Sequence, residues 1–119
     1  MKKDAGFTIL ELLIVLAVVV ILALFLIPNL VGARDKAHDT ASIIYGRNML
    51  THATAWLADE PTHKVSDLQT ACLDATYVAE GAESIFPVSV SACEVQKLGA
   101  DAYGIKVTSR TGNEFQFRN

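Results

Sequence analysis

The sequence predicts an α+β fold in which one long N-terminal helix packs its second half on a small antiparallel sheet. Three observations carry this prediction. The 22 residues from Leu12 to Ala33 include no charged side chain. Apolar residues between positions 43 and 57 recur at helical spacing. Two stretches near the C-terminus alternate apolar and polar residues on either side of a turn. With 119 residues the chain has room for one small domain.

The uncharged run is long enough to cross a bilayer as a helix, which takes about 20 residues. Lys2 and Lys3 precede it, and cations there hold an N-terminus on the cytoplasmic side. A secretory signal has a shorter apolar stretch, of about 7–15 residues, before a small-residue cleavage site. Gly32 and Ala33 offer such a site after Pro28. This apolar run could therefore be a cleaved signal or a plain single-pass anchor, or it could be a membrane helix with a further function.

Glu11 argues against both alternatives. A carboxylate within an apolar helix costs about 2.5–3.5 kcal/mol at mid-bilayer, and less near the interface. We expect neither a signal nor an anchor to have a use for such a residue. Glu11 is therefore a candidate functional residue.

The residues around Glu11 carry a family signature. The stretch Gly6-Phe7-Thr8-Ile9-Leu10-Glu11-Leu12-Leu13-Ile14-Val15 closely resembles the N-terminal signature of type IV pilins and the related pseudopilins. The resemblance extends from Lys2 to Thr40, and Ile9-Leu10 stands where Leu-Ile is commoner. It implies that a prepilin peptidase cuts between Gly6 and Phe7 on the cytoplasmic side and methylates the new amine of Phe7.

The resemblance also implies roles for residues further along the helix. Glu11 matches the family's assembly glutamate, and Pro28 matches its helix-kinking proline, with Gly32 loosening the same stretch one turn later. In a filament, the amine of an incoming Phe7 could pair with Glu11 of a neighbour. Pairing within one chain is the competing interpretation, because residues four apart are adjacent on a helix.

The helix is predicted to run from Phe7 to near Asp59, where Pro61 stops it. Its apolar face beyond Pro28 is predicted to hold eight residues: Ile43, Tyr45, Gly46, Met49, Leu50, Ala53, Trp56 and Leu57. Ile44 points away from that face. We expect three parts: a cleaved leader at 1–6, a transmembrane and filament-core helix at 7–33, and a globular head at 34–119.

Alternation predicts the strands of the head. Residues 103–108 and 114–118 alternate on either side of the turn at 110–113, which indicates a hairpin. Residues 85–90 are predicted as a third strand, with Pro87 near its start or on an edge, and residues 76–78 as a fourth.

Two cysteines, Cys72 and Cys93, lie in the part of the chain predicted to be exported. An even cysteine count in an oxidising compartment indicates a disulfide between them. The three histidines lie 14 and 11 positions apart, and we expect no metal, cofactor or catalytic site. Asp35, Asp39 and the pair Asp59-Glu60 are interpreted as solvated surface charges.

The charge balance limits the partners. From residue 34 onward, 8 Lys/Arg face 11 Asp/Glu, without a basic run, so strong nucleic-acid binding by a single subunit is not expected. The resemblance implies a structural subunit, not an enzyme. It would sit in the bacterial inner membrane with its N-terminus inside, and would then polymerise with other copies through the pilus assembly machinery.

Two functions remain open at this point. The first is a type IV pilus subunit serving adhesion, twitching motility or DNA uptake. The second is a minor pilin or a pseudopilin of a type II secretion or competence system. Pseudopilins of the main secretion type usually carry an acidic calcium-binding loop near the C-terminus, whereas Gly99–Tyr103 contains only Asp101 as an acid. The paired cysteines also favour a pilin.

Overall fold

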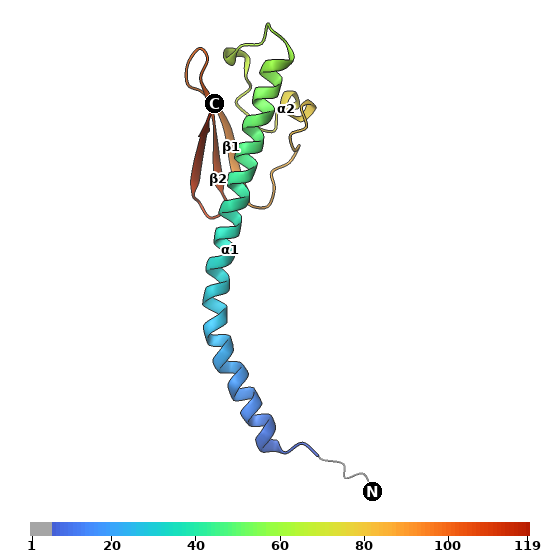
Figure 1. Ribbon diagram of the computed structural model, residues 1–119, viewed down its shortest axis with the longest axis vertical. Coiled ribbons are helices and arrows are strands. Elements are labelled where there is room, and N and C mark those ends of the chain that lie inside the picture. The colour runs from blue at the N-terminus through green and yellow to red at the C-terminus, as the bar shows by residue number, and fades with distance from the viewer. Residues whose placement is uncertain (1–5) are drawn as a thin grey trace. The chain divides into compact units, whose positions relative to one another are not determined.

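The computed structural model describes residues 6–119 (Figure 1). Lys2, Lys3 and most of the predicted leader lie outside the described residues. In chain order the elements are α1 (Ile9–Asp59), the 3-10 helix η1 (Val65–Asp67), α2 (Ala75–Ala79), β1 (Val90–Lys97), β2 (Tyr103–Ser109) and β3 (Glu114–Arg118). The chain divides into two compact units, of which the second, Asp35–Asn119, is called the head below.

Helix α1 is one continuous helix of 51 residues, and it ends two positions before Pro61, as predicted. Pro28 lies inside it, and the helical backbone continues past both Pro28 and Gly32. The kink at Pro28 stays a prediction. Continuity across a proline is possible because the missing N–H removes one hydrogen bond, while the turns on both sides keep theirs.

The sheet has three antiparallel strands in the order β1-β2-β3. The predicted hairpin is confirmed: Val107 pairs with Phe115 and Ile105 with Phe117. Gly112 in its turn has a φ of 94°, which a glycine adopts without the steric cost that a Cβ brings. On the other side of β2, Cys93 pairs with Val107.

The predicted third strand at 85–90 is wrong. Residues 88–89 form a turn in which Val90 donates its N–H to the carbonyl of Pro87 over 2.9 Å, and strand β1 begins only at Val90. Strand β1 itself was not predicted. It lies at the edge of the sheet and buries only Val90 and Val95, so apolar and polar residues do not alternate along it.

The predicted fourth strand at 76–78 is also wrong, because these residues lie in helix α2. Asp74 explains the difference: it is the N-cap residue, and its carboxylate accepts a hydrogen bond of 3.0 Å from the N–H of Thr76. A local cap of this kind favours a helical turn over the extended conformation that β-branched and aromatic residues otherwise prefer.

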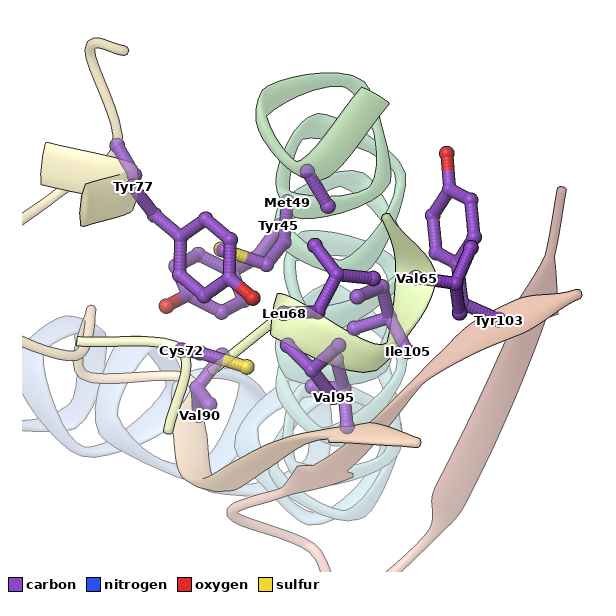
Figure 2. Packing of buried hydrophobic residues seen from close by; sticks show 13 residues of the cluster. Tyr45, Met49, Val65, Leu68, Cys72, Tyr77, Val90, Val95, Tyr103 and Ile105 are labelled. Carbon is purple, nitrogen blue, oxygen red and sulfur yellow. The ribbon is translucent and has the colours of Figure 1, made fainter. Parts of the chain in front are cut away.

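The second half of α1 packs on the sheet and forms one hydrophobic core. Figure 2 shows Tyr45 and Met49 of α1 close to Leu68, Val95 and Ile105. The predicted apolar face is largely confirmed, and Ile44 is exposed as expected. The buried residues of α1 are Ser42, Tyr45, Gly46, Met49 and Ala53.

Two polar residues of α1 within the head bind distant parts of the chain, and one of them corrects the sequence interpretation. Ser42 is fully buried, and its hydroxyl donates to the carbonyl of Ser89 over 2.8 Å, which connects the helix to the loop before β1. Asp39 is not simply a solvated charge: it accepts hydrogen bonds from Thr111 and Asn113 in the β2–β3 turn.

Candidate functional site

The N-terminus of α1 is closed by a reciprocal pair of hydrogen bonds between Thr8 and Glu11. The N–H of Glu11 donates to Thr8 Oγ1 over 3.2 Å, and Glu11 Oε2 accepts from both the N–H and the hydroxyl of Thr8, each at 2.9 Å. This is a capping box, which satisfies N–H groups that lack a partner in the first turn of a helix.

The capping box corrects one expectation from the sequence. From the sequence, no use is expected for Glu11 in a plain anchor. In the structure, however, Glu11 caps the first turn of the helix in its own chain, which would be useful in any membrane helix. The sequence contained the signal, because Thr-x-x-Glu ahead of an apolar run is the pattern of a capping box. Both donors from Thr8 are neutral, so capping leaves the negative charge of Glu11 in place and the carboxylate can still attract a cation.

The predicted cleavage site lies immediately before this box. The side chain of Phe7 is 82% exposed, and a Cβ added at Gly6 would meet no atom within 4 Å. The peptide bond between them is therefore not packed against other described parts of the chain. Cleavage there would place a new amine at Phe7, next to the capping residue Thr8 and one helical turn before Glu11.

The apolar part of α1 has its side chains on the outside. Among residues 6–119, α1 is the one helix long and apolar enough to cross a membrane, and none of its apolar window is buried within the chain. Large side chains such as Leu24 and Phe25 are 69% and 75% exposed. An apolar surface of this extent needs lipid or other protein to cover it. A Cβ at Gly32 would meet nothing within 4 Å, so Gly32 is not required for packing within the described chain.

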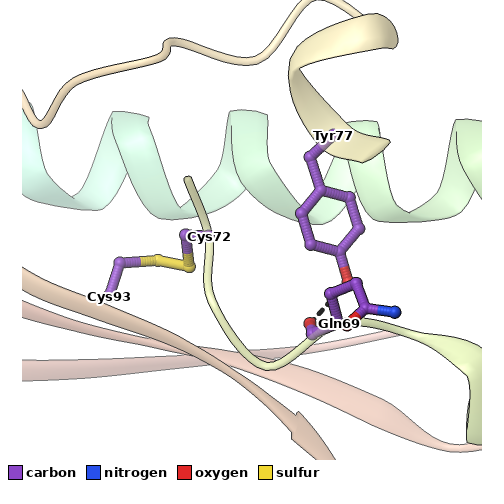
Figure 3. The surroundings of a disulfide bond; sticks show 4 residues. All are labelled: Gln69, Cys72, Tyr77 and Cys93. Carbon is purple, nitrogen blue, oxygen red and sulfur yellow. Dashed lines mark hydrogen bonds between the residues drawn. A yellow bond between two sulfur atoms is a disulfide. The ribbon is translucent and has the colours of Figure 1, made fainter. Parts of the chain in front are cut away.

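Cys72 and Cys93 form a disulfide, with their Cα atoms 5.7 Å apart (Figure 3). Cys93 is on the edge strand β1, and Cys72 is in the segment between η1 and α2. Two backbone contacts hold the same segment on this edge: Ala71 forms a bridge with Glu94, and the N–H of Val95 donates to the carbonyl of Thr70 over 2.8 Å. The disulfide therefore holds residues 70–72 against the edge strand β1.

Tyr77 holds the N-terminal end of the same segment, at Gln69. It is fully buried, and its hydroxyl donates to the carbonyl of Gln69 over 2.7 Å (Figure 3). Burial raises the pKa of Tyr77 to about 12. Together with the disulfide, this hydrogen bond anchors residues 69–72 at both of their ends.

Two of the histidines make structural contacts through their rings. His52 Nδ1 lies 3.0 Å from the carbonyl oxygen of Glu80, and His63 Nδ1 lies 2.7 Å from that of Trp56. The ring of His63 also stacks on Trp56 with a centroid distance of 3.9 Å. Among residues 6–119, no three His, Cys, Asp or Glu side chains gather in a group that could hold a metal ion.

Comparison with known proteins points to the N-terminal part of the chain. Residues 1–27 match the model of the prokaryotic N-terminal methylation motif. The chain is 53% identical over 45 residues to the type IV wide pilus major component PilA4 of Thermus thermophilus. These residues make up 38% of this chain and 34% of that protein. It is 42% identical over 43 residues to the type II secretion system core protein G of Vibrio cholerae. These residues make up 36% of this chain and 30% of that protein.

The matched segment thus spans about a third of the length of each of these curated relatives. No solved structure matches the chain significantly. The likeness therefore concerns a limited part of the chain.

Proposed function

We propose that this chain, which carries the N-terminal methylation motif found in type IV pilins and pseudopilins, is a structural subunit of a type IV pilus. One observation carries the proposal. The apolar half of α1 is exposed along its whole length, and it begins with a capped carboxylate directly after a potential cleavage site. Lipid can cover such a helix before assembly, and the same helices of other copies can cover it afterwards.

Cleavage and methylation would prepare the helix to leave the lipid and pack against the helices of other copies. Cleavage after Gly6 creates an amine at Phe7, and methylation of that amine keeps it basic. In a filament core, the amine of one copy and the Glu11 carboxylate of a neighbour would neutralise each other, whereas either charge alone would be costly in an apolar medium. The pair would also set the axial register, because packing between apolar helices has little directional preference.

The proposal implies a location and a set of partners. The precursor would lie in the bacterial inner membrane with its N-terminus inside, and its partners there would be a prepilin peptidase and the assembly machinery. After assembly the head would be outside the cell, in a polymer of identical subunits. Adhesion, twitching motility and DNA uptake are the uses that such a filament would serve, and an enzymatic role is not part of the proposal.

A second candidate function is supported by the likeness to the core protein G of Vibrio cholerae. In that case the chain would be a pseudopilin of a type II secretion or competence system, or a minor pilin. The same N-terminal processing and the same exposed helix would serve this role, so the two candidates differ in how much of the chain accumulates in surface filaments.

One experiment separates these possibilities. Filaments are sheared from cells that express the chain, and the subunit is identified by mass spectrometry. The proposed function predicts abundant chain that starts at N-methylated Phe7. A processed chain that stays in the cell envelope, with only traces in the sheared fraction, would favour the pseudopilin or minor pilin. A mature terminus near Gly32 or Ala33 would contradict both.

A further inference from the structure

The two edges of the sheet differ in what covers them. At the β1 edge, residues 70–72 are held by the bridge between Ala71 and Glu94 and by the disulfide between Cys72 and Cys93. Strand β3 is the last strand at the other edge, and among residues 6–119 no further strand or bridge pairs with its outer side. We call this outer side of β3 the free edge. An unpaired edge offers N–H and C=O groups to another chain.

The free edge presents the backbone groups of Glu114, Gln116 and Arg118. Directly after β3, Asn119 donates its N–H to the carbonyl of Tyr103 over 3.2 Å, so the odd-numbered residues in this part of the chain bond to β2. Along an antiparallel strand the backbone groups of successive residues point to opposite sides. The even-numbered residues of β3 therefore point their N–H and C=O groups outward, and all three of them are exposed.

The residue order of β3 is self-complementary. From position 114 to position 118 the strand reads Glu-Phe-Gln-Phe-Arg. Two copies placed antiparallel about Gln116 would bring Glu114 opposite Arg118 at both ends, and Gln116 opposite Gln116. All of these would be hydrogen-bonded pairs, because they use the backbone groups that point outward. Two copies placed parallel in register would instead bring like charges opposite each other, which is destabilising.

Both charged residues of β3 are available for such a contact. Glu114 Oε1 lies 3.0 Å from Lys106 Nζ, but the side chain of Glu114 is still 54% exposed. Its second carboxylate oxygen can therefore accept from another cation. Arg118 forms no ion pair among residues 6–119. Lys106 is paired with Gln116 across the ladder and lies one strand behind the free edge, so it would not face the second copy.

The charges just beyond β3 also fit an antiparallel pair. Arg110 lies in the turn before the strand, and its N–H is bonded to the carbonyl of Ser89. At the other end, the carbonyl of Asp101 accepts a hydrogen bond of 2.9 Å from the side chain of Asn119. The antiparallel arrangement brings the end with Arg110 toward the end with Asp101, so it adds no pair of like charges.

The apolar side of β3 would gain cover from the same contact. Phe115 and Phe117 alternate with the charged residues and are half-buried. Phe117 packs against the core, where its ring lies close to Gly46 of α1. In the antiparallel pair, Phe115 would lie opposite Phe117 of the second copy at the pairs that bring side chains closest together. Aromatic pairs across two strands stabilise a sheet.

The direction of β3 decides which copies can meet. The start of β3 lies near Asp39, because Asn113 binds that residue. Its end lies near Tyr103, whose hydroxyl is 2.6 Å from Thr54 Oγ1. Strand β3 therefore runs in the same direction as the part of α1 in the head. An antiparallel pair of β3 strands requires two heads whose helices run in opposite directions.

We infer that the free edge of β3 pairs antiparallel with β3 of a second copy, centred on Gln116, and that this contact joins two filaments running in opposite directions. The inference rests on the proposed function, in which all copies of one filament leave the same membrane and run the same way. The second copy therefore belongs to another filament, such as one from a facing cell. Because both halves of the contact are the same surface, it is isologous and joins copies in pairs.

Cysteine cross-linking of concentrated filaments tests the contact. The two copies of Gln116 would have Cα atoms about 5.5 Å apart, a separation that a disulfide spans. Filaments with Gln116→Cys should give a covalent dimer and no larger species on mild oxidation, since Cys72 and Cys93 are already bonded to each other. The control Arg110→Cys, exposed in the turn, should give none. The turn lies about 10 Å from Gln116 along the strand, which places its two copies about 20 Å apart.

Charge reversal gives a second test, in which two kinds of filament are mixed. Filaments with Glu114→Arg would place arginine against arginine at both ends of the contact, and filaments with Arg118→Glu would place glutamate against glutamate. Each preparation alone should lose the association that low-speed sedimentation of sheared wild-type filaments measures. A mixture of the two should associate again, because every arginine then meets a glutamate. The number of filaments per cell should stay normal in both variants.

The outcomes distinguish the inference from the proposed function. Wild-type filaments that contain the chain, with no dimer from Gln116→Cys and no association regained on mixing, would overturn the inference and leave the proposed function intact. Dimers that are equally abundant in dilute, separate filaments would show a contact within one filament and would also overturn the inference. If wild-type cells build no surface filament from this chain, the proposed function fails and the contact between filaments fails with it.

Discussion

The side-chain amide of Asn113 donates a hydrogen bond of 2.7 Å to Asp39 Oδ2, which ties the β2–β3 turn to a helix 74 positions earlier in the chain. The hydroxyl of Thr111 donates to the other oxygen of the same carboxylate. These hydrogen bonds lower the pKa of Asp39, with the largest effect from Thr111, followed by Ser109 and Asn113. The turn thus stabilises the ionised form of Asp39.

This relationship predicts how the head responds to acid. Because the folded-state pKa of Asp39 is lower than the unfolded value of about 3.9, its contribution to stability is full above that value. The contribution is lost as the pH falls through the lower folded-state pKa. We expect Asp39→Ala to lower the free energy of unfolding at pH 6 and to remove part of the decline below pH 4. Unfolding of the full chain in detergent, followed by the fluorescence of Trp56, measures both.

Asp35→Ala is the matched control for Asp39. Asp35 is an exposed carboxylate on the same helix, one turn earlier. Its removal should leave the free energy of unfolding at pH 6 close to that of the wild type, because Asp35 makes no contact with the β2–β3 turn. Equal effects of the two variants would contradict a specific role for the turn.

Gly46 allows α1 to approach the sheet closely, and we predict that Gly46→Ala destabilises the head. An added Cβ would lie 2.7 Å from Phe117 Cδ2 and 3.0 Å from Cγ2 of the fully buried Val107. Overpacking of this kind costs about 1–3 kcal/mol, against a gain of up to about 1 kcal/mol in helix propensity. The loss should be visible in the unfolding of the full chain in detergent.

A double-mutant cycle checks the cause. In a chain that already carries Phe117→Ala, the main obstacle to the new Cβ is gone. The additional loss caused by Gly46→Ala should then be smaller than in the wild type. An undiminished loss would mean that the clash is with the rest of the sheet and not with Phe117.

The disulfide should contribute about 3 kcal/mol to the free energy of unfolding, as the chain-entropy model gives for a loop of this length. Cys72 and Cys93 are 21 positions apart. We expect the variant with both cysteines changed to alanine to unfold at lower denaturant concentration, and the edge of β1 to become accessible to proteolysis first. Reduced wild-type chain is the control and should behave similarly. Identical stability with and without the bond would contradict the prediction.

Tyr45→Phe should stabilise the head. The hydroxyl of Tyr45 is buried without a hydrogen-bond partner among residues 6–119, and an unsatisfied buried polar group costs about 1–3 kcal/mol. Burial, with a smaller effect of Glu83, raises the pKa of Tyr45 to about 12. The free energy of unfolding of Tyr45→Phe at pH 7 should therefore be higher than that of the wild type.

The same residue predicts the alkaline behaviour. Above pH 10 the unfolded chain releases the tyrosine protons while the folded chain retains them, so stability decreases between about pH 10 and pH 12. Tyr45→Phe should reduce this decrease but not abolish it, because Tyr77 also has a pKa of about 12. An alkaline decrease as steep as that of the wild type would contradict the assignment to Tyr45.

Variants of Thr8 and Glu11 separate capping from pairing between copies. In Glu11→Gln the amide can still close the capping box, but the negative charge is gone. In Thr8→Val the capping hydroxyl is gone, and the charge remains. If pairing with the Phe7 amine drives assembly, Glu11→Gln should abolish filaments while the processed chain persists in the membrane. Thr8→Val should still form them.

The readouts for this pair are filament counts and the amount of processed chain in the membrane. The opposite result, with filaments from Glu11→Gln but not from Thr8→Val, would assign the role of Glu11 to capping. Loss of the chain itself in Glu11→Gln would contradict the expectation that Glu11 is unnecessary for insertion and folding.

The sequence by itself was sufficient for the features that depend on local patterns. The uncharged run, the end of α1 before Pro61 and the hairpin of β2 and β3 each follow from periodicity or from turn residues within a short stretch. Even the capping box of Thr8 and Glu11 could have been predicted, since its members are three positions apart. For these features the physical cause acts between near neighbours in the chain.

Only the tertiary structure decided the features that depend on distant neighbours. The contact of Asp39 with the β2–β3 turn, and the space at Gly46 that Phe117 fills, join segments about 70 positions apart. Strand β1 shows no clear alternation, because its environment is set by β2 on one side and by residues 70–72 on the other. Hydrophobic burial is non-directional, so the pattern of a sequence indicates which residues are buried but not which partners they meet.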